Sequence, residues 1–249
     1  RTKVLFICPP VRLSAPARIP PMGYLYMAAV LEEADIDVEV LDVNLLRLPL
    51  NDLMNLIAKK EFDVIGIGGM TTVYYYIKML SLQLKMRYPH IPIIGGGSAC
   101  SASPEVVLQN TGVDVVCIGE GEPIIVDLVR GLVAGGKVGH LGGIAYRDRD
   151  GNVVKSAPRA RNLDLSGLPW PAYHLADMEQ YITNNQTKYA SDPGLKNWVL
   201  ERGIDPDKAD RPVFLYSKRG CPFGCSFCYR NFGRKVVYHP VDYVLDHMS

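Results

Sequence analysis

The chain has 249 residues, 48% of them apolar, which is enough for one large domain or two small ones with a proper core. Its 27 basic and 26 acidic residues give a net charge of +1, so composition offers no electrostatic case for binding nucleic acid. No apolar run approaches the roughly 18 residues of a membrane span, and no secretory segment is present. We therefore expect a cytoplasmic protein, and because the chain starts at Arg1 we expect a trimmed N-terminus.

Residues 1 to about 137 alternate between short apolar runs and segments with helical spacing. Strands are predicted at 3–8, 37–43, 63–68, 91–95 and 114–118. Helices are predicted between them at 23–34, 51–60, 74–88, 104–110 and 123–134. Such β–α units with nearly all-apolar strands predict an α/β fold: a flavodoxin-like (Rossmann-like), doubly wound parallel sheet with strand order 2-1-3-4-5.

The pattern changes after this region. A hairpin is predicted at 144–147 and 153–155, around the turn-rich stretch 148–152. Residues 157 to about 211 show little periodicity and read as a linker that lies over a surface, whereas 212–217 is short, apolar and aromatic, like a buried strand. A helix is predicted at 241–247. The expected organisation is an N-terminal domain over 1–140, a hairpin and linker over 141–211, and an incomplete second domain over 212–249.

Three cysteines, Cys221, Cys225 and Cys228, lie within eight residues with the spacing C-x3-C-x2-C. Three thiolates this close can hold three irons of a cubane iron–sulfur cluster and leave the fourth iron open, which is typical of catalytic rather than structural metal sites. A structural zinc site would need a second ligand pair, and His239 and His247 lie eight residues apart, too far for one. The spacing favours an iron–sulfur cluster over zinc or inert thiols.

The remaining cysteines, Cys8, Cys100 and Cys117, have no partner at ligand spacing, so we interpret them as buried structural thiols. Two histidines of the N-terminal half, His90 and His140, lie in predicted loops. We interpret these two as solvated or hydrogen-bonded surface residues.

Small residues gather after the predicted strands, at the edge of the sheet where open α/β folds bind ligands. They would make room for a wide, flat ligand with backbone amides and hydroxyls at its rim. The candidates are Pro10, Met22, Gly23, Tyr24, Gly69, Thr71, Thr72, Gly95, Gly96, Gly97, Ser98, Gly119, Glu120 and Gly121.

Ordinary turn chemistry is the alternative interpretation of each glycine cluster, and a nucleotide phosphate at a helix N-terminus is another. No G-x-G-x-x-G opens the first helix, which argues against a dinucleotide site. Glu120 and Glu122 could act as catalytic acids or, as we expect, occupy a helix start where the dipole favours them.

The cysteine run resembles the signature of the radical S-adenosylmethionine (radical SAM) superfamily, C-x3-C-x-aromatic-C after the first strand of a barrel, with Phe227 as the aromatic residue. The resemblance implies a [4Fe-4S] cluster on Cys221, Cys225 and Cys228. It also implies S-adenosylmethionine on the open iron, reductive cleavage to a 5′-deoxyadenosyl radical, and Phe227 near the adenine. Residues 212–249 would begin a radical SAM (β/α) barrel, and a flavodoxin- or ferredoxin-type protein would supply the electron.

Over its whole length the chain is similar to the cobalamin (B12)-binding branch of that superfamily. The resemblance rests on Pro9-Pro10, Pro21-Met-Gly-Tyr24, Gly95-Gly-Gly97, Gly119-Glu-Gly-Glu122 and Leu168-Pro-Trp-Pro-Ala-Tyr173. It implies cobalamin whose nucleotide tail enters between sheet and helices near Thr71, Thr72, Gly95, Gly96, Gly97 and Ser98. B12 domains of mutases and methionine synthase carry a cobalt-ligating histidine after the first strand, and this loop has none. We therefore expect base-off cobalamin without a histidine ligand.

The resemblance implies a B12-dependent radical SAM enzyme that transfers a methyl group to an unactivated atom of a small-molecule or natural-product substrate. Arg219 and Arg230 would balance charge near the cluster. Three alternatives stay open. The first is a cyclase or rearranging enzyme, such as the anaerobic magnesium-protoporphyrin ester cyclase. The second is a cobalamin-binding module without catalysis of its own, and the third is a radical SAM enzyme that has lost cobalamin.

Overall fold

The computed structural model describes residues 1–248 except 13, 137, 204, 206–213 and 230–232. Its centre is a seven-stranded sheet with the order β2-β1-β3-β4-β5-β6-β7. β1 to β5 are parallel, as predicted, while β6 and β7 are antiparallel. The strands are β1 (Lys3–Cys8), β2 (Asp37–Asp42), β3 (Val64–Gly68), β4 (Ile93–Gly96), β5 (Val115–Cys117), β6 (Ile144–Arg147) and β7 (Val153–Lys155).

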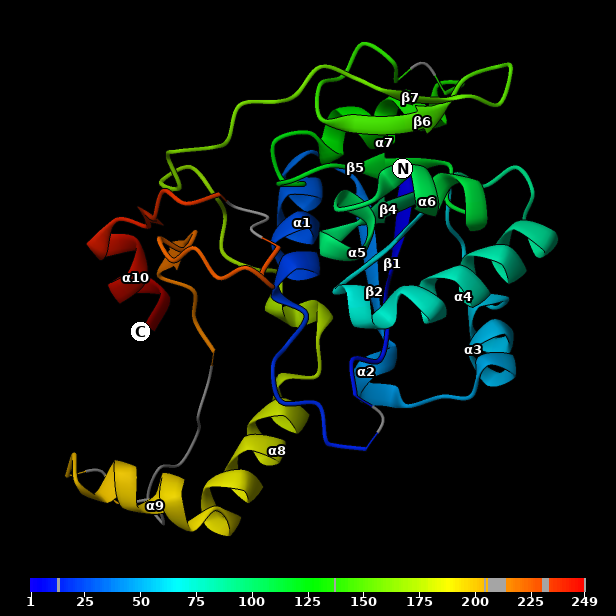
Figure 1. Cartoon of the computed structure of the whole chain (residues 1–249). Helices are drawn as coiled ribbons and strands as arrows, with labels where there is room; N and C mark the ends of the chain where they lie inside the picture. Colours follow the sequence, from blue (N-terminus) through cyan, green and yellow to red (C-terminus); the bar gives the residue numbers. More distant parts are fainter. Residues whose placement is uncertain (13, 137, 204, 206–213, 230–232, 249) are drawn as a thin grey trace.

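Helices cover both faces of the sheet and make three layers (Figure 1). Alternate residues of the strands point to opposite faces, so Phe6 packs toward the layer of α1 and α7, whereas Ile7 packs toward α3 and α4. The helices of these layers are α1 (Met22–Glu33), α2 (Val43–Leu46), α3 (Leu50–Ile57), α4 (Tyr74–Arg87) with the preceding turn η1 (Thr71–Val73), α5 (Gly97–Ser101), α6 (Pro104–Asn110) and α7 (Ile125–Val133). The short helices α2 and α5 were not predicted.

The predicted hairpin is present and extends the sheet beyond β5. β6 pairs with β5 in antiparallel register, with Cys117 opposite Ile144. Arg147 fixes this edge, because its guanidinium donates to the carbonyl oxygen of Val113 at 3.0 Å and also to that of Leu108. The β–α core therefore ends at β5, and the hairpin covers an edge that would otherwise be open.

The expectation of an irregular linker over 157–211 is wrong in part. The turn η2 (Tyr173–Leu175) and the helices α8 (Met178–Ser191) and α9 (Pro193–Leu200) lie in this stretch. On α8 the buried side chains Tyr181, Ile182 and Asn185 form only a narrow stripe in a polar sequence, so hydrophobic periodicity is too weak to predict the helix.

The predicted strand at 212–217 differs from the structure. Positions 212 and 213 lie outside the described residues, and 214–217 form no strand. β8 (Lys218–Arg219) follows instead and pairs with β9 (Val237–Tyr238), ahead of α10 (Val241–Met248), which confirms the last predicted helix. A strand needs a hydrogen-bonding neighbour, and in the described part of the chain β9 is the neighbour that this segment has.

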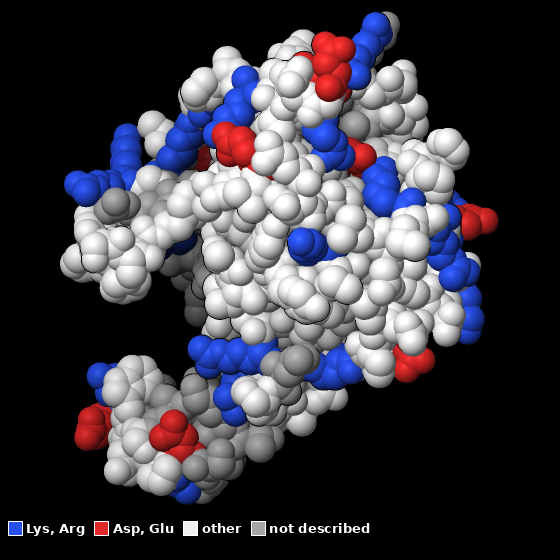
Figure 2. Space-filling view, turned by 45° about the vertical axis from the view of Figure 1, so that its right-hand side comes forward, with Lys and Arg blue, Asp and Glu red and all other residues white. Residues whose placement is uncertain are grey.

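The α8–α9 arm projects away from the body, and a broad hollow separates it from the part of the chain that carries α10 (Figures 1 and 2). Basic and acidic side chains are interspersed over the face in Figure 2. Among the described residues, no helix combines the length and apolar character that a membrane crossing requires.

Candidate functional site

A cavity of about 300 Å³ lies between the carboxyl ends of β1, β3, β4 and β5 and the helices α1 and α7. This is the edge where the parallel strands of such folds bind ligands. Of the predicted candidates, those that line the cavity are Met22, Gly23, Tyr24, Gly69, Gly96, Gly97, Gly119, Glu120 and Gly121. Pro10, Thr71, Thr72, Gly95 and Ser98 do not line it, and their contribution to ligand binding stays a prediction.

Sequence reasoning missed part of the lining. Phe6, Met27 and Ile125 supply apolar wall from β1, α1 and α7, and Tyr216 enters from the segment that leads to the cysteines. Phe6 and Ile125 read as ordinary core positions, and nothing in the sequence around Tyr216 marks it as a neighbour of β3 or β4. The sequence feature that could have pointed to Tyr216 is its position five residues before Cys221.

The glycines of β3 and β4 let two strand ends approach closely. A Cβ on Gly68 would lie 2.4 Å from the carbonyl oxygen of Gly96. Gly97 has φ +70°, and a Cβ there would lie 2.7 Å from the amide nitrogen of Gly69. A Cβ on Gly96 would meet no atom within 4 Å, so this residue borders open space. The strand ends are thus packed backbone to backbone, with room left above Gly96.

Tyr24 joins the ends of β1 and β3 under the cavity. Its hydroxyl accepts a hydrogen bond from the Gly68 N–H at 2.7 Å. Its proton lies within reach of two carbonyl oxygens, of Gly68 at 2.9 Å and of Ile7 at 3.0 Å. Burial raises the pKa of Tyr24 well above its usual value, so the hydroxyl keeps the proton it donates.

Two carboxylates on the β5–α7 loop hold one arginine of the C-terminal segment. Arg219 Nη2 lies 2.6 Å from Glu122 Oε1, and Nη1 lies 3.8 Å from Glu120 Oε1. All three side chains are 9% exposed or less. Both glutamates precede α7, which begins at Ile125, so the expected helix-start role is replaced by this buried ion cluster.

Residues of the linker form hydrogen bonds with the ion cluster and with the backbone around it. The N–H of Asn162 donates to Glu120 Oε2 at 2.8 Å, and Arg159 donates to the Glu120 carbonyl oxygen. Arg161 donates to the Arg219 carbonyl oxygen at 3.2 Å and to that of Lys235. The β5–α7 loop, the linker and β8 therefore form one polar junction beside the cavity.

The cysteine loop begins directly after this junction. Gly220 has φ +94°, and a Cβ there would lie 2.3 Å from the carbonyl oxygen of Lys235, so only glycine suits the approach of β8 to the 235 backbone. Cys221, Cys225 and Cys228 are exposed free thiols. Phe227 is 90% exposed and does not line the cavity, and Arg230 lies outside the described residues.

The donor set suits an iron–sulfur cluster in its chemistry, because three accessible thiols lie in one short loop. Within the described part of the chain, however, no three His, Cys, Asp or Glu side chains are gathered closely enough to hold a metal ion. Ligation of a metal centre generally organises its own loop, so we expect the loop to close when the thiolates bind.

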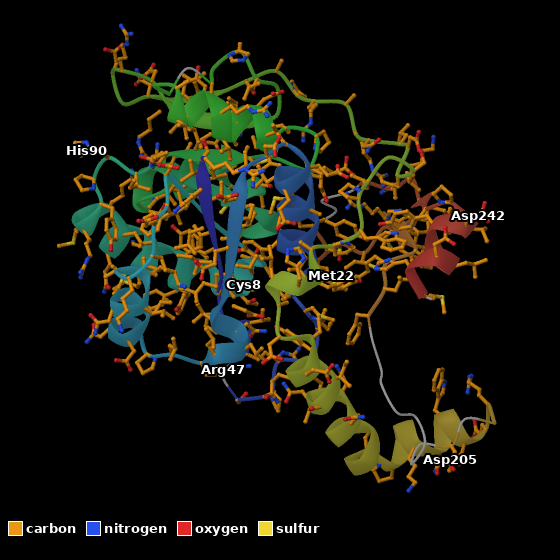
Figure 3. The ribbon with its side chains drawn as sticks, turned by 180° about the vertical axis from the view of Figure 1, so that it is seen from behind. Cys8, Met22, Arg47, His90, Asp205 and Asp242 are labelled. Carbon is orange, nitrogen blue, oxygen red and sulfur yellow. The ribbon has the colours of Figure 1, made fainter. Side chains whose placement is uncertain are left out.

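His90 and His140, interpreted from the sequence as surface residues, are both exposed. His90 lies far from Cys8 and Met22, which lie near the carboxyl edge of the sheet (Figure 3). No histidine is found among the described residues that line the cavity. The other three cysteines, Cys8, Cys100 and Cys117, are buried free thiols, as predicted.

Helix α8, absent from the sequence prediction, fastens the loop between β1 and α1. The Tyr181 hydroxyl donates to the buried carboxylate of Asp42. Asn184 and Asn185 donate to the carbonyl oxygens of Ala17 at 2.6 Å and Arg18 at 2.7 Å. This loop borders the carboxyl edge of the sheet, so α8 fixes one wall around the site.

Comparison with known proteins supports these observations. Residues 9–129 match the family described as B12 binding domain. The chain is 27% identical over 99% of its length to an uncharacterized methyltransferase of Pyrococcus horikoshii, and 28% identical over 98% to a cytidylyl-2-hydroxyethylphosphonate methyltransferase of Streptomyces wedmorensis. It is 25% identical over 85% to an anaerobic magnesium-protoporphyrin IX monomethyl ester cyclase of Synechocystis. It spans 50%, 51% and 38% of these relatives.

Two solved structures share the fold. The cobalamin-dependent S-adenosylmethionine radical enzyme OxsB, with aqua-cobalamin and S-adenosylmethionine bound, matches 99% of this chain with a TM-score of 0.73 and 20% identity. The radical S-adenosylmethionine methyltransferase TsrM from Kitasatospora setae, with tryptophan and a SAM analogue bound, matches 100% with a TM-score of 0.66 and 19% identity. The chain covers 31% and 45% of these two proteins.

Proposed function

Residues 9–129 match the family of B12 binding domains, and from this premise we propose that the chain is the cobalamin-binding and cluster-loop portion of a B12-dependent radical SAM enzyme. The observation that carries the proposal is the position of the cysteine run. Arg219, two residues before Cys221, is bound by the same two glutamates that line the cavity. The two candidate sites therefore adjoin.

The residues of the cavity fit cobalamin. The space above Gly96 and Gly119, where a Cβ would meet no atom within 4 Å, takes the nucleotide tail between the sheet and the helices α1 and α7. Tyr24 and the close strand ends keep the floor rigid. A nucleotide tail held in this space would be detached from cobalt, and no histidine among the described residues lines the cavity to replace it, so we expect base-off cobalamin without a histidine ligand.

Cys221, Cys225 and Cys228 are the residues that would hold a [4Fe-4S] cluster with S-adenosylmethionine on its open iron. When bound, the cluster supplies the electron that cleaves S-adenosylmethionine, and cobalamin supplies the methyl group. The chain itself contributes position: the short run from Arg219 to Cys221 ties the thiols to the cavity wall. Methyl transfer to a small-molecule substrate agrees with the names of two relatives, which are methyltransferases.

A cyclase without net methyl transfer is the second candidate, because a magnesium-protoporphyrin IX monomethyl ester cyclase is among the relatives, at 25% identity. The two candidates differ in the fate of the methyl group. S-adenosylmethionine labelled at the methyl carbon transfers its label to product in a methyltransferase and does not in such a cyclase.

The cluster is tested by anaerobic reconstitution of the chain with iron and sulfide. We expect about four irons per chain, visible charge-transfer absorbance, and reductive cleavage of S-adenosylmethionine to 5′-deoxyadenosine under dithionite. The Cys221→Ala/Cys225→Ala/Cys228→Ala variant should lose all three signals, while the Cys100→Ala variant, which alters a buried thiol, should keep them. Zinc in the wild-type loop, or an unchanged triple variant, would refute this part of the proposal.

The cofactor is tested separately by gel filtration with hydroxocobalamin. The chain should retain corrin absorbance, and the spectrum should be that of base-off cobalamin. Loss of the corrin on the column would leave the fold as a scaffold without cofactor and would overturn the B12 assignment.

A further inference from the structure

The buried ion cluster of Glu120, Glu122 and Arg219 has a feature that packing alone does not explain. Glu120 Oε1 is buried but accepts no hydrogen bond from any described residue, and its nearest cation is Arg219 at 3.8 Å. The other oxygen, Oε2, is satisfied by the Asn162 N–H at 2.8 Å. A buried carboxylate oxygen without a donor costs free energy, so this atom is suited to a donor that arrives with a ligand.

The position of this atom indicates which ligand group can reach it. Glu120 lines the cavity together with Gly119 and Gly121, and a Cβ on the neighbouring Gly119 would meet no atom within 4 Å, so one side of Glu120 borders open space. A corrin ring carries carboxamide side chains around its rim, and their N–H groups are donors. A carboxamide at the cavity mouth would supply the hydrogen bond that Glu120 Oε1 lacks, and it would compete there with Arg219.

Arg219 connects the two glutamates at the cavity with the cysteine loop, because only Gly220 separates it from Cys221. It is held by Glu122 at 2.6 Å, and its guanidinium carbon lies 5.2 Å from the ring centre of Tyr26 on α1. Gly220 is fixed against the Lys235 carbonyl oxygen, and Cys221 follows at once. A guanidinium with two carboxylate partners has two alternative bonding patterns, which is the kind of element that couples two sites.

We propose that Glu120, Glu122 and Arg219 couple the occupancy of the corrin cavity to the conformation of the cysteine loop. Glu120 accepts a hydrogen bond from an amide group of the ligand, and Arg219 moves wholly onto Glu122 and draws Cys221 toward the cavity. Arg219 is thus a positioning residue that prepares the loop for its cluster only when the corrin is in place. This inference rests on the proposed function, and by linkage a closed loop must in turn strengthen corrin binding.

The test uses the metal-free chain and the reactivity of its thiols. Cys100 is fully buried and does not line the cavity, so it should stay unlabelled in the folded protein, whereas the three loop cysteines are exposed. Alkylation of Cys221 by iodoacetamide is followed by mass spectrometry with and without methylcobalamin, whose cobalt does not react with thiols. We expect methylcobalamin to slow the labelling of Cys221 about fivefold or more.

The variants separate coupling from simple shielding of the loop by the ligand. In Arg219→Met the chain should still retain the corrin, but the ratio of labelling rates should fall to about one. If Arg219→Met fails to fold, Glu122→Gln serves instead, because it keeps the shape of the side chain. It should also lower the ratio of the Cys221 labelling rates. Arg202→Met is the matched control, because Arg202 is an exposed arginine stacked on Trp198 at 4.0 Å and lies in the projecting arm.

The outcomes are distinct. If the wild-type chain does not retain the corrin, the proposed function falls and takes this inference with it. If the corrin is retained but Cys221 labelling is unchanged, or is slowed equally in wild type and Arg219→Met, the coupling is refuted while the B12 assignment stands. New labelling of Cys100 identifies Arg219→Met as misfolded, and the labelling ratio of Glu122→Gln then decides whether the coupling exists.

Discussion

At the scale of single residues, the absence of side chains at glycines determines both the packing and the free space at the site. Gly68 and Gly96 lie side by side in paired strands, yet their environments are opposite. A Cβ on Gly68 would lie 2.4 Å from a backbone oxygen that cannot move without its strand, whereas one on Gly96 would enter open space. The lack of a side chain at Gly68 is therefore required for the strands to pack, whereas at Gly96 it leaves space beside the cavity.

This contrast gives a paired prediction. Gly68→Ala should lower the free energy of unfolding by about 1–3 kcal/mol, the usual cost of overpacking. Gly96→Ala should leave that energy nearly unchanged but weaken cobalamin binding, because the methyl group occupies ligand space. Urea unfolding and equilibrium titration with cobalamin measure the two effects. An unfolding energy that falls more in Gly96→Ala than in Gly68→Ala would contradict this division of roles.

Residue-level prediction from sequence reaches those features whose pattern is local. The thiol spacing of the cysteine run and the small residues after each strand are both visible in a single sequence, and many of the latter line the cavity. Arg219 and Glu122 are 97 positions apart, and nothing in either neighbourhood indicates that they pair. Such a contact depends on how the C-terminal segment folds back over the sheet edge.

At the scale of elements, β1 to β5 were predictable because a parallel strand covered on both faces reads as an unbroken apolar run. Helix α8 was not predictable, because it is attached through polar side chains that form hydrogen bonds to a loop. Hydrophobic periodicity reports only apolar burial, so a helix attached through Tyr181, Asn184 and Asn185 leaves a faint pattern in the sequence. The short pairing of β8 with β9 is likewise a matter of tertiary contacts.

The attachment of α8 can be tested through the loop that it holds. Tyr181→Phe removes the hydroxyl that donates to the buried carboxylate of Asp42, which should cost about 1–3 kcal/mol and free the loop after β1. We expect faster tryptic cleavage after Arg12 and Arg18 at native conditions, read by mass spectrometry.

A substitution on the exposed side of the same helix, Thr183→Ala, is the control for the α8 experiment and should leave the cleavage rate unchanged. Equal cleavage rates in wild type and Tyr181→Phe would show that α8 does not restrain this loop.

At the scale of the whole molecule, burial of thiols makes stability depend on alkaline pH. Burial raises the pKa of Cys117 to about 11 and of Cys100 to about 12, from an ordinary value of 9.0. Below pH 9 the thiols are protonated in both the folded and the unfolded chain, so their protonation does not reduce the free energy of unfolding. Above it the unfolded chain loses the thiol protons first, and stability falls until the folded thiols ionise as well.

We therefore expect the free energy of unfolding to decrease from about pH 9 upward, by on the order of 1 kcal/mol per buried thiol at pH 10. Urea midpoints at pH 8 and pH 10 measure the loss. The Cys100→Ala variant has one such group fewer and should lose less stability over this interval. The same loss in both proteins would assign the alkaline transition to other groups, such as the buried tyrosines.

Half of the cysteine thiols are buried and half are exposed: Cys8, Cys100 and Cys117 lie inside the fold, whereas the other three stand on one exposed loop. Air will therefore oxidise the loop long before it reaches the interior. A preparation handled aerobically should remain folded by circular dichroism while its capacity to take up iron is already gone. For this protein, structural integrity is thus no measure of redox competence, and the two must be assayed separately.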